Sequence, residues 1–184
     1  MSLEEIKNIN KNNFVDPLPD EVEKFKEIFE DFEQQIKNKD ILSVEKDNIW
    51  KQQQFFIWSD YIGYFFYKLE KDFLELEEIA SSNMNLFQKE QVKQIFYWDV
   101  DKLSGRKVSY FWIFMMKKLV DIAKRNNVKM VKISRIEDTS AGFYRKTGEL
   151  FVKMWLIKSY DWPKIEKIEN SYMDWWEKNI YWYL

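Results

Sequence analysis

The sequence of 184 residues predicts an α+β fold, a mixed β-sheet flanked by helices. Two observations carry this prediction. Apolar residues recur every third or fourth position in some stretches, which is typical of amphipathic helices, and every second position in others, which is typical of strands. Four Gly and three Pro are few for this length, so long elements joined by short turns are expected.

The first element expected is a helix that begins after Pro19. Asp20, followed three residues later by Glu23, forms a capping-box pattern. Apolar residues then follow at helical spacing, namely Val22, Phe25, Ile28, Phe29, Phe32 and Ile36. The polar residues 1–16 are interpreted as an arm, and residues 17–184 as a single domain.

From Gln52 the period of the pattern changes to two. Residues 54–58 and 64–69 flank a turn at 59–63 and predict a hairpin. Residues 73–80 alternate apolar and acidic side chains and predict a third strand.

Residues 81–106 do not fit a minimal domain of this class. They contain a further candidate strand at 94–100, so the segment is either an insertion or carries the strand that precedes the next helix.

The stretch from Val108 to Gly148 predicts a helix, a strand and a compact turn. The helix opens with the apolar residues 110–116, and Asn126 and Asn127 are suited to end it because Asn tolerates the left-handed conformation. Residues 128–133 are short and rich in β-branched side chains, which indicates a buried parallel strand.

Two elements are expected after Gly148. Residues 150–157 are interpreted as a core strand. Residues 163–184 are interpreted as an aromatic-rich C-terminal helix that starts at Trp162-Pro163, since Pro suits the first turn. Its aromatic stripe either packs on the sheet or forms an interface for a second copy, as in a homodimer, or for a target protein.

Part of this stretch resembles the second half of a GNAT acyltransferase domain. The residues that carry the resemblance are Ala123 to Val128, the strand that follows, and the pattern Phe143-Tyr144-x-Lys146-x-Gly148. The resemblance covers residues 52–157. It implies acetyl-CoA as cofactor and a role for Tyr144 in protonating the CoA thiolate.

The resemblance also implies a base on the strand before the phosphate loop. Glu77 and Glu78 are the candidates, and the alternative is that both belong to a solvated sheet face.

The family binds the CoA pyrophosphate with Arg/Gln-x-x-Gly-x-Gly/Ala at a helix start, where backbone N–H groups approach the phosphates. Counting back from Ala123 places Lys107 at the basic position, but Tyr110 and Trp112 at the two glycine positions. Those rings would fill the phosphate space. A nearby substitute becomes available if the helix begins earlier, and its candidate cofactor-binding residues are Gly105, Arg106, Lys107 and Ser109.

Composition excludes several kinds of site. The chain has no Cys and no His, which removes disulfides, thiol catalysis, zinc sites built on those ligands and imidazole-based triads. Asp99 and Asp101 have the spacing to hold a hard cation, but they are interpreted as a solvated turn, so no metal is expected.

Net charge and hydropathy limit the classes of partner that are expected. The net charge of -2 disfavours nucleic acid, although residues 51–58 interleave aromatic side chains with Lys as single-strand binders do. The longest apolar run, 110–116, is too short to span a bilayer, so a cytoplasmic protein without a membrane partner is expected.

Two functions follow as hypotheses. The first is an acyl-CoA-dependent N-acyltransferase that acts on an amine whose identity the sequence does not give. The alternative is a catalytically inactive GNAT-fold protein that acts as a protein-binding or inhibitory module, which the aromatic residues at the phosphate loop favour.

Overall fold

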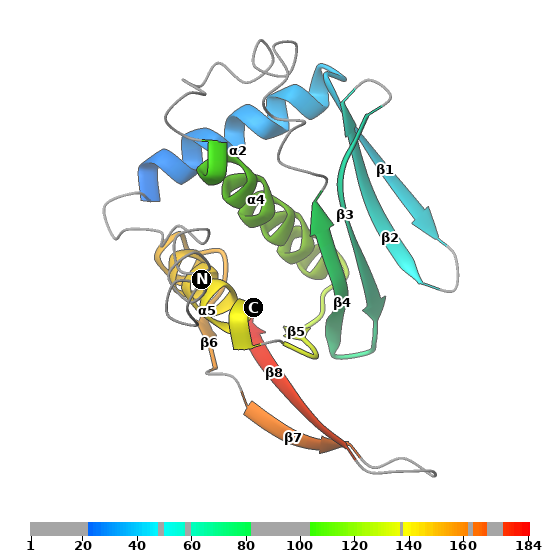
Figure 1. The fold of residues 1–184 in the computed structure, drawn as a ribbon, viewed down its shortest axis with the longest axis vertical. Helices are drawn as coiled ribbons and strands as arrows, with labels where there is room; N and C mark the ends of the chain where they lie inside the picture. The colour runs from blue at the N-terminus through cyan, green and yellow to red at the C-terminus, as the bar shows by residue number, and fades with distance from the viewer. Residues whose placement is uncertain are drawn as a thin grey trace, which may run out of the picture. The chain divides into compact units, whose positions relative to one another are not determined.

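The computed structural model describes residues 22–47, 50–57, 60–81, 104–136, 138–161, 164–168 and 175–184. Its elements are α2 (Val22–Lys37), β1 (Ile41–Asp47), β2 (Lys51–Ile57), β3 (Asp60–Leu69), β4 (Phe73–Ser81), α4 (Ser104–Arg125), β5 (Met130–Ile133), α5 (Asp138–Lys153), β6 (Ser159–Tyr160), β7 (Lys164–Ile168) and β8 (Trp175–Tyr183) (Figure 1). The strand order is β1-β2-β3-β4-β5-β8-β6, and β7 pairs with β8. The predicted α+β class, with a mixed sheet and helices, is confirmed.

The chain divides into two compact units, the first with residues 1–65 and 79–116 and the second with 66–78 and 117–184. Strands β3 and β4 and helix α4 contribute residues to both units. The predicted division into a polar arm and one domain stays a prediction, since residues 1–21 lie outside the described ranges.

Phenylalanine rings form the core of the first unit. Phe32 of α2 stacks on Phe114 of α4 with ring centroids 4.8 Å apart, and Phe55 of β2 meets Phe111 edge-on at 5.5 Å. All four rings are buried, and such rings bury more apolar area than any other side chain type. The apolar faces predicted for the two helices therefore pack on each other and on β2.

Gly63 of β3 allows α4 to lie close to the strand. A Cβ at this position would lie 3.0 Å from the Ala80 carbonyl oxygen, 3.0 Å from the Phe111 ring and 3.1 Å from the Met115 sulfur. Space, and not backbone conformation, is therefore the reason for glycine here.

In the second unit, β4 pairs in parallel with β5 from Phe73↔Met130 to Leu76↔Ile133. Strand β8 pairs antiparallel with β5 from Met130↔Tyr183 to Ile133↔Ile180. Because side chains alternate along a strand, one face of this paired stretch carries buried apolar residues, namely Leu74, Leu76, Val131, Ile133, Ile180 and Trp182.

Helix α5 packs on this apolar face. The rings of Phe151 and Trp182 lie 5.4 Å apart in an edge-on arrangement. A Cβ at Gly148 would lie 2.9 Å from Trp182 Nε1 and 3.1 Å from the Tyr160 ring. The glycine of the Phe-Tyr-x-Lys-x-Gly pattern therefore permits close packing of helix on strand.

The prediction of a C-terminal helix over 163–184 is wrong. The described part of this segment forms an antiparallel pair, β7 with β8, from Lys164↔Asn179 to Ile168↔Trp175. Aromatic residues lie on both faces of β8, so they also produce a helical spacing that mimics an amphipathic stripe. Pairing with β5 and burial of Ile180 and Trp182 favour the strand over the helix in this segment.

The prediction of a core strand over 150–157 is also wrong. Helix α5 continues to Lys153, because Leu150 and Phe151 lie one turn beyond Thr147 and two turns beyond Phe143 on the same buried side. The chain then closes the helix at Trp155 and enters β6 at Ser159.

The remaining predictions divide three ways. The first helix, the two hairpin strands, the strand at 73–80 and the strand ending at Ile133 are confirmed as α2, β2, β3, β4 and β5. Strand β1 was missed, and α4 begins at Ser104, before the predicted start at 110. The candidate strand at 94–100, Asp99, Asp101 and the possible insertion lie outside the described residues.

Among the described helices, none has the length and apolar character needed to cross a bilayer.

Candidate functional site on the second unit

The parallel pairing of β4 and β5 ends before β4 does. The last partners are Leu76 and Ile133, whereas β4 continues to Ser81. A long contact from Ser134 N to Leu76 O, at 3.4 Å, follows the last pair. Arg135 then adopts a left-handed conformation with φ 55°, and the chain turns away from β4 toward β8.

Backbone hydrogen bonds fix this turn. Arg135 N donates to the Asn179 side-chain oxygen at 3.3 Å, and Ile136 N donates to the Lys178 carbonyl at 2.9 Å. Asn179 is completely buried, so the turn rests on a fixed polar side chain. The two central strands consequently part at Ser134.

Beside this turn lies an open recess of about 600 Å³, lined by Arg135, Ile136, Trp176, Glu177 and Lys178. The guanidinium Nε of Arg135 lies 3.2 Å from Glu177 Oε1. Trp176 is two-thirds exposed. Trp176 and Glu177 are consecutive residues of β8, so their side chains leave the strand on opposite sides, and the ring face of Trp176 is the feature of this recess that suits a cationic amine.

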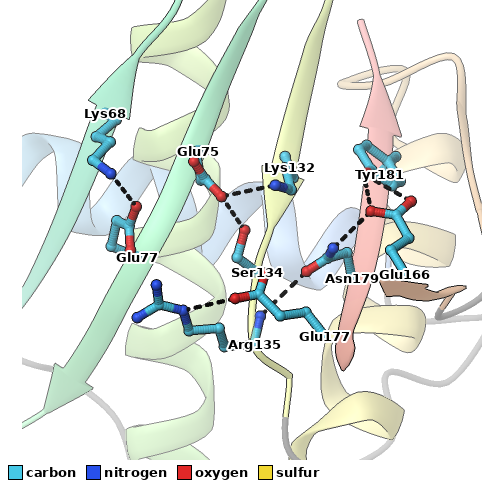
Figure 2. A network of polar contacts seen from close by, with 10 residues as sticks. All are labelled: Lys68, Glu75, Glu77, Lys132, Ser134, Arg135, Glu166, Glu177, Asn179 and Tyr181. Atoms are coloured by element: carbon cyan, nitrogen blue, oxygen red, sulfur yellow. Dashed lines mark hydrogen bonds and ion pairs between the residues drawn. The ribbon is translucent and has the colours of Figure 1, made fainter. Parts of the chain in front are cut away.

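The face opposite the apolar one carries a network of polar contacts, which we call the polar face; it comprises Lys68, Glu75, Glu77, Lys132, Ser134, Glu166, Asn179 and Tyr181 (Figure 2). Lys132 Nζ lies 3.0 Å from Glu75 Oε1, and the Ser134 hydroxyl donates a short hydrogen bond to the same oxygen. Both charged side chains are less than one-fifth exposed. Lys68 Nζ lies 3.1 Å from Glu77 Oε1 on the neighbouring pair of strands.

The pKa of Glu75 results from opposing effects. Burial raises it, but the hydrogen bonds from Ser134 and Lys132, with the charges of Lys132 and Lys68, outweigh burial and hold the pKa below its ordinary value of 4.5. Glu75 is therefore ionised at neutral pH and fixed in position by two donors.

A second carboxylate, Glu166 of β7, is held from β8. Its Oε2 accepts hydrogen bonds from Asn179 Nδ2 at 2.8 Å and from the Tyr181 hydroxyl at 2.7 Å. Burial, followed by the hydrogen bond to Glu166, raises the pKa of the Tyr181 phenol, so Tyr181 remains a proton-bearing donor at neutral pH.

The two predicted bases lie on opposite sides of β4. Glu77 is on the polar face, 13% exposed and paired with Lys68. Glu78 is exposed and, as the next residue of the strand, shares the side of Leu74 and Leu76. The structure thus groups Glu77 with Glu75 and separates it from Glu78.

The predicted acid, Tyr144, lies on α5. It is buried, with 8% of its surface exposed, and its ring lies 5.3 Å from that of Phe143. Since α5 packs on the apolar face, Tyr144 lies on one side of the sheet, and the side chain of Glu77 lies on the other. The β4–β5 pairing ends at Leu76 and Ile133, and beyond this point no β4–β5 hydrogen-bonded ladder separates the polar face from the apolar face.

The predicted cofactor-binding residues all lie at the beginning of α4. Because the helix starts at Ser104, Gly105, Arg106 and Lys107 occupy its first turn, and Ser109 the second. Tyr110 and Trp112 lie further along the helix and are not at its start. The condition stated for the substitute phosphate site, an earlier helix start, is met, while the role of these four residues stays a prediction.

Several residues of the polar face were not predicted from the sequence as site residues. Glu166, Asn179 and Tyr181 were placed on a helix, and Glu75, Lys132 and Ser134 were not singled out. The signal available was the alternation of Asn179, Tyr181 and Tyr183 with Ile180 and Trp182, which predicts a strand with one polar side. No cluster of three or more metal-ligating side chains occurs within the described ranges.

Comparison with known proteins gives similarity at the level of structure only. No protein-family model matches the sequence, and none of the curated proteins matches it either. A ribosomal-protein-S18-alanine N-acetyltransferase from Escherichia coli is 10% identical over 74% of this chain and 70% of its own, with a TM-score of 0.41.

Two further solved structures show the same level of similarity. An IAA acetyltransferase from Bacillus cereus is 12% identical over 73% of this chain and 78% of its own, with a TM-score of 0.40. A Bacillus subtilis acetyltransferase in complex with CoA is 12% identical over 78% of this chain and 97% of its own, with a TM-score of 0.43. All three solved structures are of acetyltransferases.

Proposed function

We propose that this chain is an acyl-CoA-dependent N-acyltransferase that acts on an amine. The observation that supports this most is the end of the β4–β5 pairing at Leu76, beyond which β4 continues to Ser81 without pairing to β5. Backbone at the end of a ladder can pair with an extended ligand that carries amides, as in strand addition. The pantetheine arm of CoA is such a ligand, and the resemblance over residues 123–148 implies it.

The start of α4, which belongs to the first unit, has features of an anion site. Gly105 lies in the first turn of α4, and a helix N-terminus favours an anion. Arg106 and Lys107 add two positive charges in the same turn. These are the residues that would hold the pyrophosphate.

When bound, acyl-CoA would supply the thioester carbon that an amine attacks. Within the chain, Glu77 accepts the proton that the amine loses, and Lys68 neutralises this carboxylate until a cationic substrate replaces it. Tyr144 holds the proton required by the departing thiolate, and its burial keeps that proton away from water.

The amine would approach through the recess at Arg135. Trp176 lines it, and the face of its exposed ring attracts an ammonium group. The exposed position of this recess is compatible with an amine carried on a larger molecule.

Thermal unfolding with and without acetyl-CoA tests cofactor binding. At a ligand concentration about 100 times the dissociation constant, binding adds about 2.7 kcal/mol to the free energy of unfolding, so the melting temperature should rise. Arg106→Ala combined with Lys107→Ala should remove the rise, whereas the control Lys46→Ala on β1 should not. A folded chain that acetyl-CoA does not stabilise would instead support the alternative, an inactive fold acting as a protein-binding or inhibitory module.

Turnover of acetyl-CoA with a panel of amines tests the chemistry. Tyr144→Phe removes only the phenol proton, so the rate should fall by about 10²–10³ at unchanged cofactor affinity. Tyr61→Phe in the first unit is the matched control. Glu77→Gln should lower the rate by a similar factor, and an effect seen only in Glu78→Gln would move the base to the other side of β4.

A further inference from the structure

All three described helices end in the same backbone motif. In each, the residue after the last turn adopts a left-handed conformation, at Lys39 (φ 66°), Asn127 (φ 56°) and Trp155 (φ 59°). At the end of α5, Trp155 N donates to Val152 O at 3.1 Å and Leu156 N donates to Phe151 O at 2.9 Å. This is the Schellman arrangement, for which Gly is common and Asn is tolerated.

Trp155 is poorly suited to that position. A bulky residue in the left-handed region is a conformational outlier, because its Cβ lies too close to the carbonyl oxygen. Burial does not compensate for this strain, since 91% of the Trp155 surface is exposed, more than for any other large hydrophobic residue in the described ranges. The fold of α5 therefore gains nothing from tryptophan here.

A recess lies directly beside the exposed ring. It has a volume of about 550 Å³ and is lined by Trp155 with Val152, Leu156, Ile157, Leu184, Lys124, Lys153 and Lys158. The three lysines are exposed, whereas the four aliphatic side chains are half-buried or buried. The recess therefore has an apolar floor and a cationic rim.

Within the described ranges, carboxylate side chains near the rim neutralise little of this charge. Lys153 Nζ lies 3.5 Å from Glu149 Oε1, a solvent-exposed contact of little strength. Lys124 and Lys158 leave a local positive charge on a chain whose formal net charge is -2. An occupant with negative charges around an apolar group would complement this surface.

We propose that Trp155 and the adjoining recess form a docking site for an acidic peptide segment of a partner protein. The segment inserts one apolar side chain against Val152 and Leu156, under the indole of Trp155, and its carboxylates meet Lys124 and Lys158. A concave recess accepts a side chain, whereas a flat bilayer surface cannot fill it. Exposed tryptophan beside a desolvated pocket is typical of residues that dominate binding energy.

The site is separate from acyl transfer. None of its residues belongs to the polar face or to the residues proposed to hold acyl-CoA. Tyr144→Phe should therefore leave peptide binding intact, so that failure of the proposed activity and failure of this docking site can be told apart.

Selection from a library of random short peptides displayed on phage tests the proposal with the full chain as bait. Peptides retained by the chain, after removal of those that also bind Trp155→Asn, should be rich in Asp and Glu around one apolar residue. In fluorescence anisotropy, Trp155→Asn should weaken binding of a labelled selected peptide about thirtyfold or more, equivalent to about 2 kcal/mol. The control Trp176→Ala, which removes another exposed tryptophan from a different recess, should leave the affinity unchanged.

Charge reversal tests the rim. Lys124→Glu with Lys158→Glu should reduce the affinity for the same peptide about tenfold or more. Lys46→Glu with Lys71→Glu changes the net charge equally at exposed positions elsewhere and should have little effect. Circular dichroism of each variant should show the folded chain, since all four lysines are exposed.

Several outcomes would overturn the proposal. Selection that yields no Trp155-dependent peptide, or yields basic or uncharged ones, contradicts an acidic ligand. Binding of Trp155-intact protein to phosphatidylserine vesicles, competing with the peptide and lost in Trp155→Asn, would assign the site to a lipid surface. Light scattering that shows a dimer dependent on Trp155 would assign it to a second copy.

Discussion

The two faces of β4, β5 and β8 in the second unit are built from alternate residues of the same strands, yet they are held together differently. On the apolar face, Ile180 and Trp182 pack under α5, and their contribution depends on area removed from water. On the polar face, Glu75 and Glu166 are each held by donors from other strands. The register that buries one face also determines which polar groups meet on the other.

The difference lies in what each face requires. An apolar side chain is satisfied by any close neighbour, so its face tolerates several partners. A partly buried carboxylate requires donors at hydrogen-bond distance, since burial without them is costly. One such donor to Glu75 is the hydroxyl of Ser134, 59 residues away in the chain, so the placement of this carboxylate depends on the tertiary fold.

Two neighbouring residues of β8 provide the largest expected contrast. Trp182→Ala removes a completely buried ring from the apolar face and should lower the free energy of unfolding by about 3–5 kcal/mol. Tyr181→Phe removes only a hydroxyl from the polar face and should cost about 1–2 kcal/mol, because Asn179 still donates to Glu166. Urea unfolding measures both, and equal losses would contradict the difference between the faces.

Two glycines of α5 sharpen the description of the apolar face. Gly148→Ala places a Cβ 2.9 Å from Trp182 Nε1, so overpacking should destabilise by about 1–3 kcal/mol despite the gain in helix propensity. Gly142 has nothing within 4 Å, and Gly142→Ala should stabilise by about 0.5–1 kcal/mol. Thermal unfolding of the pair should give shifts of opposite sign. A stabilising Gly148→Ala would show that α5 lies further from β8.

Substitution of Trp155 at the end of α5 should raise the free energy of unfolding by a small amount. Trp155→Asn introduces the residue that ends α4 with the same backbone hydrogen bonds, and the native contacts of an exposed ring are few. We expect a gain of about 0.5–1 kcal/mol in the free energy of unfolding, measured in urea. Asn127→Trp, the reciprocal change, should be destabilising, and a loss of stability in Trp155→Asn would indicate that the indole supports the fold.

The smallest effect concerns the pH dependence of stability. The folded-state pKa of Glu75 lies below 4.5, so the unfolded chain binds more protons as the pH falls through this range, and stability is lost there. Glu75→Gln should reduce this loss of stability at acidic pH.

In the first unit, burial raises the pKa of Asp31 above 3.8, and a hydrogen bond from Gln35 partly opposes this shift. The free energy of unfolding therefore rises as the pH falls through that range.

Asp31→Asn is therefore the control of opposite sign, and it should remove a gain on acidification. Urea midpoints measured from pH 6 downward report both slopes. Variants that change the slope in the same direction would contradict the assignment of these two carboxylates.

The sequence by itself determined the elements whose pattern is local. Helices α2 and α4 and strand β4 were predictable because apolar residues recur with one clear period, and burial of that side decides their conformation. The compact turn predicted at the Phe-Tyr-x-Lys-x-Gly pattern is wrong, since this stretch lies within helix α5. For the candidate site, Glu77 and Tyr144 were named from a family resemblance, and the helix start near Gly105 was recognised as the alternative.

Only the tertiary structure decided the segments whose pattern is ambiguous. Residues 175–183 have aromatic side chains at both strand and helix spacing, and pairing with β5 and β7 selects the strand. The polar face follows from that pairing, since Asn179 and Tyr181 reach Glu166 only across the β7–β8 register. The left-handed, exposed Trp155 was equally hidden, because a tryptophan after an apolar run indicates burial until the end of α5 places it in solvent.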